Sequence, residues 1–241
     1  MTYNLEPLGY IQSCFPEKFG IPRQPLLVPS AKAELLLLPP FNDPDCVEGL
    51  SESSHVWLSF IFHQHVDSKW KVKVRPPRLG GNKKSGVFAT RSSFRPNNLG
   101  LSAVKLEKIE TTTNQVKLIF SGIDLLDGTP IVDIKPYIPY SDAIPNAVNL
   151  LAAVSPIICP VIFTQQAKEF CADYSEATCL ETLCLESLLT EVLQQDPRPA
   201  YQAVDENRYY KMKLLDLDVE WRCYLVDGNK VIEVININVI S

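Results

Sequence analysis

Between residues 3 and 140 the chain consists of short apolar and β-branched runs separated by proline, glycine, asparagine and aspartate. The runs follow one another at even spacing, with no amphipathic helical segment between them, which is typical of a closed or nearly closed β-barrel. A Rossmann sheet is not expected, because no GxGxxG turn joins a strand to a helix. The expected strands are Leu8–Ile11, Glu34–Leu38, Val56–Phe62, Val72–Val74, Gly86–Ala89, Val104–Ile109, Val116–Ser121 and Ile131–Ile134.

The pattern changes to helical spacing over Thr164–Gln195, where apolar residues recur at steps of three and four. Pro197 ends this helical segment. Three later runs predict a β-meander with a hairpin turn at Asp227-Gly228. These runs are Tyr209–Leu215, Val219–Val226 and Val231–Val239. The sequence therefore predicts a mainly β protein, with a small β-barrel domain over residues 1–150 and a small α+β domain over residues 151–241.

Composition indicates a soluble globular protein, since 46% of the 241 residues are hydrophobic and 21% are charged. These proportions exclude disordered, collagen-like and coiled-coil classes. The longest apolar runs are far shorter than the roughly 20 residues of a membrane helix, and residues 1–6 lack the features of a signal peptide. The seven cysteines form no CxxC motif. We therefore expect a cytoplasmic protein with reduced thiols and no membrane partner.

Basic residues are concentrated in one stretch, although the net charge of the chain is −5. Lys69–Lys105 holds ten basic residues and no acidic one, which leaves 13 basic against 28 acidic residues elsewhere. Such a concentration is typical of a surface that docks phosphates, although a charge run can equally be a solvated face. The residues expected to contact RNA are Lys71, Lys73, Arg75, Arg78, Lys83, Lys84 and Arg95. Arg198, between two prolines, is a weaker candidate that could instead pin the second domain to the first through an acidic partner.

Loops of the first domain carry side chains suited to ligand binding. Arginines stand in proline- and glycine-rich turns, and a guanidinium suits a carboxylate or a phosphate. His63 and His65 lie two apart on one face of an expected strand, a spacing that can chelate metal. No further ligand accompanies them, so no metal is expected, and a metal-dependent hydrolase that also uses His55 is left as an alternative. The absence of GxSxG, Walker and HExxH motifs excludes serine hydrolases, P-loop NTPases and zincins.

Several of these loops resemble one known family. The segments that carry the resemblance are Glu17–Gln24, Val74–Asn82, Gly86–Ser92, Arg95–Asn97, Gly100–Ser102, Asp124–Thr129, Asp133–Tyr137 and Gln195–Tyr201. Together they closely resemble the TsaA/TrmO-like family of S-adenosylmethionine-dependent tRNA methyltransferases, over essentially the whole chain. Any one motif is a weak signal, but so many motifs in the same order make a chance resemblance improbable.

The resemblance implies methylation of the exocyclic N6 of threonylcarbamoyladenosine, beside the anticodon of threonine tRNA, with S-adenosylmethionine as the methyl donor. It also implies a β-barrel donor domain, a homodimer, and the tRNA anticodon stem-loop rather than DNA as the partner. The donor-binding residues that it implies are Pro22, Arg23, Gln24, His63, Gln64, Arg91, Leu101, Leu126, Asp127, Gly128 and Thr129. The alternative is a non-catalytic RNA-binding β-barrel module, which would use the same basic stretch and bind no donor.

Methyl transfer of this kind requires a proton acceptor. The acceptor nitrogen must lose its proton during or just after transfer, and a positioned general base typically contributes roughly 10²- to 10⁴-fold. Among the motif residues, Asp133 and Tyr137 are the candidate catalytic groups, four apart at the end of an expected strand. In the alternative interpretation, Asp133 satisfies backbone amides and Tyr137 is a stacking platform.

Overall fold

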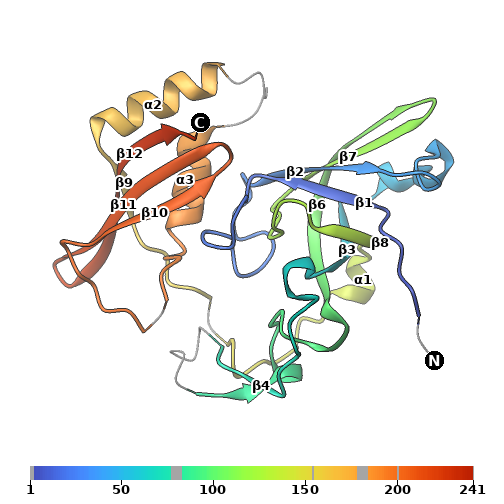
Figure 1. Ribbon diagram of the computed structural model, residues 1–241, viewed down its shortest axis with the longest axis horizontal. Coiled ribbons are helices and arrows are strands. Elements are labelled where there is room, and N and C mark those ends of the chain that lie inside the picture. Colours follow the sequence, from blue (N-terminus) through green and yellow to red (C-terminus); the bar gives the residue numbers. More distant parts are fainter. Residues whose placement is uncertain (1–2, 77–82, 154, 178–183, 200, 241) are drawn as a thin grey trace.

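The computed structural model describes residues 3–76, 83–153, 155–177, 184–199 and 201–240, and its N-terminal half is a closed six-stranded barrel (Figure 1). The strands follow the order β1-β2-β7-β6-β3-β8 around the barrel. Their bounds are β1 Gly9–Ser13, β2 Lys32–Leu37, β3 His55–Ile61, β6 Leu99–Thr112, β7 Gln115–Ser121 and β8 Pro130–Pro136. The expected barrel is thereby confirmed.

The barrel forms because its strands alternate buried and outward positions, as β3 illustrates. Val56, Leu58 and Phe60 point into the core, while Trp57 and Ser59 face outward. Each large apolar side chain that is fully buried in this way contributes roughly 1.5–3 kcal/mol. β3 pairs with β6 on one side and β8 on the other, and β1 pairs with β2 and β8, so the ring closes without a free edge.

Gly100 on β6 permits a close approach inside the barrel. It lies opposite Phe60 in the β3–β6 register. A Cβ at this position would collide with the Phe60 ring. A glycine at this position therefore lets the aromatic ring lie across the strand.

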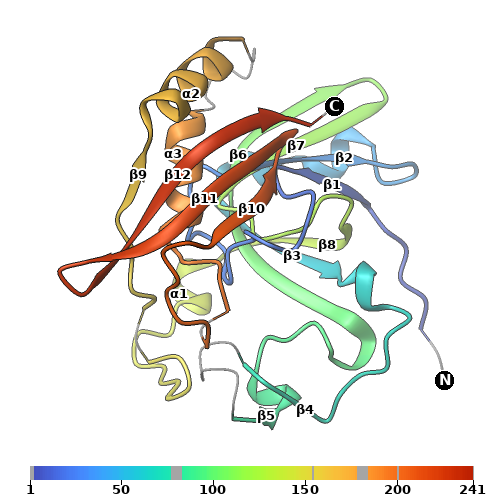
Figure 2. The same ribbon diagram turned by 60° about the vertical axis from the view of Figure 1, so that its left-hand side comes forward.

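Two of the expected barrel strands lie outside the barrel. β4 (Lys73–Val74) and β5 (Ser85–Gly86) pair only with each other, in a separate two-stranded ribbon below the barrel (Figure 2). Residues Val87–Ala89 form a 3₁₀ turn instead of continuing a strand. The ribbon and the turn stay outside the barrel because they have few apolar side chains to bury. Val72 is 69% exposed, and only Val74 and Val87 are buried.

The C-terminal unit contains a four-stranded sheet in the order β10-β11-β12-β9 with two helices. The elements are β9 Val161–Phe163, α2 Gln165–Ala177, α3 Leu185–Leu193, β10 Tyr209–Leu214, β11 Leu217–Val226 and β12 Asn229–Val239, after a one-turn helix α1, Pro139–Asp142. The predicted meander is correct, and Asp227 and Gly228 both have positive φ, as a tight hairpin turn requires. The sequence pattern missed β9, which is only three residues long and pairs parallel to β12.

The barrel and the C-terminal unit are packed against each other. Glu191 on α3 accepts hydrogen bonds from the backbone amide and the hydroxyl of Ser30, at 2.7 and 2.9 Å. The Leu215 amide donates to the Cys14 carbonyl, and Met212 packs on Gly20. One continuous hydrophobic cluster runs through both units. No helix among the described residues is long and apolar enough to cross a membrane.

Candidate functional site

An open groove of about 1300 Å³ lies beside the β4–β5 ribbon. It is bordered by the loop at residues 23–24, the ribbon, the 3₁₀ turn at residues 87–89 with the loop to residue 94, and residues 149–152. Its basic lining residues are Arg23, Lys71, Lys73, Arg75, Lys84 and Arg91. Among the described residues that line this basic groove none is acidic, so it attracts anions.

The predicted donor-binding loop at Pro22–Gln24 forms one side of the basic groove. Pro22 is buried, which anchors the loop, while Arg23 is exposed. Arg91 donates a hydrogen bond to the Gln24 side-chain oxygen from across the groove. The structure thus brings Arg91 next to Arg23 and Gln24, although Arg91 and Gln24 are 67 positions apart in the sequence. Two guanidinium groups on this side of the groove can hold a carboxylate or a phosphate.

Most of the predicted RNA-binding residues lie at the basic groove. Lys71, Lys73, Arg75 and Lys84 line the basic groove, and Lys83 is exposed beside it. Lys71 also lies over the Phe94 ring, with its Nζ 3.8 Å from the ring centroid.

Arg95 and Arg78 complete the predicted set within the basic stretch. Arg95 donates from one guanidinium nitrogen to the Thr90 and Ser92 carbonyls at 3.1 and 3.5 Å, so it braces its own loop. Arg78 lies outside the described residues.

A second, smaller pocket of about 170 Å³ adjoins the basic groove, because Ser93 lines both. We call it the histidine pocket. Its lining residues are Lys18, Ile21, Phe60, Phe62, His63, Gln64, His65, Ser93, Asp124, Leu125, Leu126 and Thr129. It therefore holds four of the predicted donor-binding residues, namely His63, Gln64, Leu126 and Thr129.

His63 and His65 lie on a 3₁₀ turn, His63–His65, rather than on a strand as expected. β3 ends at Ile61, before the first of the two histidines. Burial lowers the pKa of both imidazoles, and the nearby Lys18 ammonium lowers it further. His65 lies 3.3 Å from the Ser93 hydroxyl and packs against the Phe94 ring. No group of three or more potential ligands is positioned to hold a metal ion in the part of the chain that the structure describes.

The segment Leu126–Thr129 is a tight turn that leads into β8. Gly128 has φ of 74°, a conformation that glycine adopts readily. Asp127 accepts a hydrogen bond of 2.9 Å from the Ser13 amide, and the Thr129 hydroxyl donates to the Leu126 carbonyl at 2.6 Å. Asp127 and Gly128 thus shape the turn, whereas Leu126 and Thr129 line the histidine pocket.

Leu101, Asp133 and Tyr137 lie on the outer face of the barrel, away from both cavities. Leu101 and Asp133 stand opposite Ser59 on its two sides, and Leu101 is 55% exposed. Asp133 forms an ion pair with Lys135 at 3.4 Å, and the Tyr137 ring packs on Trp57 with 5.6 Å between centroids. None of the three lines the basic groove or the histidine pocket.

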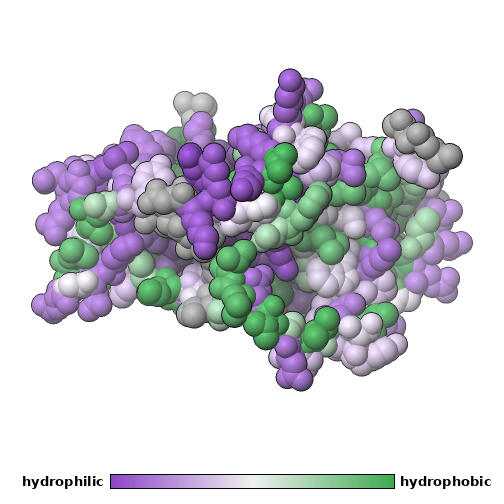
Figure 3. All heavy atoms as spheres, turned by 90° about the horizontal axis from the view of Figure 1, so that it is seen from below, coloured by the Kyte–Doolittle hydropathy of each residue, from purple (hydrophilic) through white to green (hydrophobic). Residues whose placement is uncertain are grey.

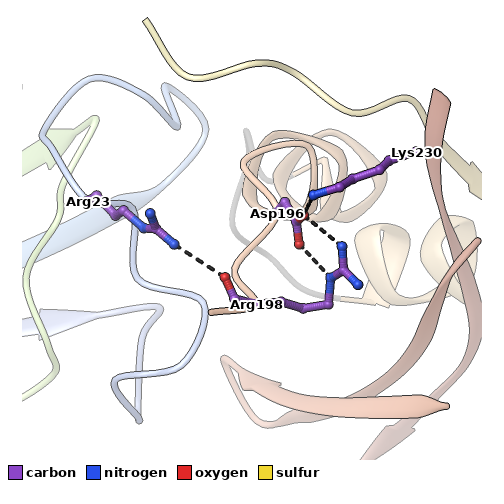
Figure 4. A network of polar contacts seen from close by, with 4 residues as sticks. All are labelled: Arg23, Asp196, Arg198 and Lys230. Atoms are coloured by element: carbon purple, nitrogen blue, oxygen red, sulfur yellow. Dashed lines mark hydrogen bonds and ion pairs between the residues drawn. The ribbon is translucent and has the colours of Figure 1, made fainter. Parts of the chain in front are cut away.

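Arg198 is buried in the C-terminal unit instead of facing solvent. Its guanidinium forms a two-point ion pair with Asp196 at 2.7 and 2.8 Å, and Lys230 approaches the same carboxylate at 2.9 Å (Figure 4). Burial alone would raise the pKa of Asp196, but the hydrogen bonds from both cations outweigh it and hold the pKa below its ordinary range. The acidic partner lies two residues away in the same domain, so the ion pair does not itself join the second domain to the first. A buried and paired guanidinium also presents no charge to RNA.

The Arg198 backbone also connects this ion pair to the basic groove. Its carbonyl accepts a hydrogen bond of 3.3 Å from Arg23, across 175 positions of sequence (Figure 4). The Asp-Pro-Arg-Pro loop therefore helps to orient one of the groove arginines.

Asp124 is a polar residue of the histidine pocket that the sequence analysis did not single out, and the buried Ser102 lies behind it. The Ser102 hydroxyl donates a hydrogen bond of 2.7 Å to the Asp124 carboxylate. Burial raises the pKa of Asp124 to about 6, although the Ser102 hydrogen bond and the charge of Arg91 oppose the shift. The available signal was a carboxylate three residues after the end of an apolar strand, and an aspartate in such a position is also an ordinary turn residue.

The sequence matches two family models in order. Residues 10–143 match the tRNA-methyltransferase O N-terminal domain, and residues 156–240 match the TrmO C-terminal domain. The tRNA (adenine(37)-N6)-methyltransferase of Escherichia coli K12 is 43% identical over 229 residues, which cover 92% of this chain and 93% of that protein. A Pseudomonas aeruginosa protein named as a candidate S-adenosylmethionine-dependent methyltransferase, RcsF, is 48% identical over 234 residues, or 97% of this chain and 98% of that relative.

A solved structure agrees with the fold over the full length. The crystal structure of TrmO from Pseudomonas aeruginosa has a TM-score of 0.80 and 42% identity, and the comparison covers 99% of both chains. The motifs of the first domain, the barrel and the C-terminal unit thus lead to one assignment. This chain belongs to the tRNA-methyltransferase O family.

Proposed function

We propose that this protein is an S-adenosylmethionine-dependent tRNA methyltransferase that acts on the exocyclic N6 of adenine-37. The observation that carries the proposal is the basic groove, which adjoins the histidine pocket at Ser93. A cationic groove suits the phosphates of RNA, and a small pocket beside it suits part of a donor or a single base. The names of the relatives, which include a tRNA (adenine(37)-N6)-methyltransferase, support the same activity.

The side chains around the two cavities fit S-adenosylmethionine by their chemistry. When bound, this donor supplies an activated methyl group on a positively charged sulfur. Arg23 and Arg91 would hold its carboxylate, since guanidinium–carboxylate hydrogen bonds are strong and directional. His63 and Gln64, with the turn at Leu126–Thr129, would enclose the remainder and exclude water.

The RNA would lie along the basic groove with the target base unstacked. Lys71, Lys73, Arg75 and Lys84 would contact phosphates, with Lys83 beside them. Phe94, which the groove exposes next to Lys71, offers an aromatic surface for a base. We propose that the acceptor is threonylcarbamoyladenosine in the anticodon stem-loop of threonine tRNA, and that DNA is not a substrate.

We further propose that the protein acts in the cytoplasm as a homodimer. Exposed apolar side chains support self-association, because large exposed patches commonly mark interfaces. Those of the segment after β8 are Ile138, Tyr140, Ile144, Val148, Leu150, Leu151, Ile157 and Ile158. Figure 3 shows hydrophobic side chains gathered beside hydrophilic ones on the lower face of the molecule. Leu101 would meet a donor only across such an interface. In this proposal residues 1–150 bind the donor and residues 151–241 support the groove.

The test is methyl transfer by the purified protein from S-adenosylmethionine with a labelled methyl group. Threonine tRNA with and without its threonylcarbamoyl group should differ, and only the modified form should gain label on N6. Labelling of both forms would contradict the proposed acceptor. A protein that binds tRNA but neither binds the donor nor transfers its methyl group would be an RNA-binding module instead.

A further inference from the structure

We propose that Asp124 takes the proton from the acceptor nitrogen during methyl transfer, with Ser102 as its positioning residue. This inference rests on the proposed function, since it assigns a role within the same site. It places the proton acceptor in the histidine pocket, and not at Asp133 or Tyr137 on the outer face of the barrel.

The position of Asp124 carries the inference. Its partly exposed side chain lines the histidine pocket. Ser102 is 2% exposed and points inward from β6, so it orients the carboxylate through the 2.7 Å hydrogen bond without reaching a ligand itself. Ser93 lines both this pocket and the basic groove, so an RNA base held in the groove would lie next to the pocket.

The electrostatic surroundings suit a general base. Burial raises the pKa of Asp124 to about 6, and a base works best when its pKa lies near the operating pH. At neutral pH the group is then mostly a carboxylate and still a stronger base than an ordinary aspartate. The titratable and charged groups around it are Lys18, His63, His65, Arg91 and Asp127. Arg91 opposes the shift, and burial lowers the pKa of both imidazoles.

The bonds that break and form in methyl transfer require a proton acceptor. The carbon–sulfur bond of the donor breaks and a carbon–nitrogen bond to N6 forms, so the sulfonium becomes a neutral thioether. The acceptor nitrogen would keep a positive charge unless its proton leaves. Asp124 receives this proton on a carboxylate oxygen and releases it to water after the product departs. Asp133 is a weaker candidate, because its carboxylate is paired with Lys135 and lines neither cavity.

The experiment compares kcat as a function of pH in wild type, Asp124→Asn and Ser102→Ala, at saturating donor and tRNA. Asp124→Asn should lower kcat by roughly 10²- to 10⁴-fold. The wild-type rate should fall below about pH 6, the pKa of Asp124, and this acid limb should be missing in the variant. Ser102→Ala should move the limb to higher pH, since a lost hydrogen bond to a carboxylate raises its pKa. The matched control is Asp45→Asn, an exposed aspartate in the turn Pro44–Val47, which should behave as wild type.

Two readouts are independent of activity. Calorimetry should give Asp124→Asn and wild type the same donor affinity within about twofold, and carbon NMR of the free protein should show the Asp124 carboxyl titrating well above an ordinary aspartate. The Ser102→Ala titration decides the matter if Asp124→Asn does not fold. The inference would be overturned by an ordinary Asp124 titration, or by a near-wild-type rate and acid limb in Asp124→Asn. It would also be overturned if Asp124→Asn lost donor affinity but kept its kcat, or if the acid limb disappeared only in Asp133→Asn or Tyr137→Phe. A wild-type protein that transfers no methyl group overturns the proposed function as well.

Discussion

Removal of the Asp196 carboxylate should destabilise the protein far more than removal of a carboxylate whose basic partner is accessible to solvent. The Arg198 side chain is 1% exposed and Asp196 is 15% exposed, and the pair makes two short hydrogen bonds. Breaking a buried pair by removing one partner costs about 3–5 kcal/mol, because a buried charge is left without compensation. For a chain of this length that corresponds to a fall in Tm of roughly 6–20 °C.

The assay is urea unfolding of Asp196→Ala beside a matched control, Glu233→Ala. Glu233 pairs with Arg222 on neighbouring strands of the same sheet, at 2.7 Å, but that arginine is 36% exposed. The Arg222 guanidinium can be solvated when Glu233 is removed, so the loss should cost only about 0–1 kcal/mol. Arg198→Met combined with Asp196→Ala should recover part of the loss, because both charges of the pair are then absent. Equal destabilisation by the two single variants would refute the reasoning.

The same pair should make stability depend on pH. The pKa of Asp196 is below its ordinary range in the folded state. A carboxylate of this kind stabilises the fold at pH values above its unfolded pKa, and the stabilisation is lost as the pH falls through the lower folded pKa. Asp196→Ala should therefore lose less stability than wild type on acidification. A parallel loss in both proteins would show that the pair does not contribute in this pH range.

Arg91→Ala should weaken donor binding by about 1–3 kcal/mol, roughly 5- to 150-fold, because a hydrogen bond to a charged group is lost; unchanged affinity by calorimetry would remove Arg91 from the donor site. Lys83→Ala with Lys84→Ala should lower tRNA affinity and flatten its salt dependence, and a wild-type salt slope would indicate a solvated face. Gly100→Ala should destabilise the barrel by about 1–3 kcal/mol through overpacking, whereas Gly86→Ala, with open space around its Cβ position, should leave thermal unfolding nearly unchanged.

The sequence alone determined the local parts of this protein. Alternation of apolar and polar residues has a period of two on a strand, so the run around Val56–Phe62 predicts β3 regardless of its neighbours. Asp227-Gly228 predicts its hairpin for a similarly local reason, since few residues tolerate positive φ. The order of short motifs was sufficient to indicate the family.

Only the tertiary structure decided which distant residues meet. It separated the β4–β5 ribbon from the barrel, although the sequence pattern predicts strands in both, because the ribbon has few apolar side chains to bury. It placed Asp124 against Ser102, 22 positions away, and Arg23 against the Arg198 carbonyl, 175 positions away. Burial, which sets the pKa of a carboxylate, arises from all the elements packed around the group. No local pattern contains that information, and for this reason a residue that reads as an ordinary turn aspartate lies in the pocket.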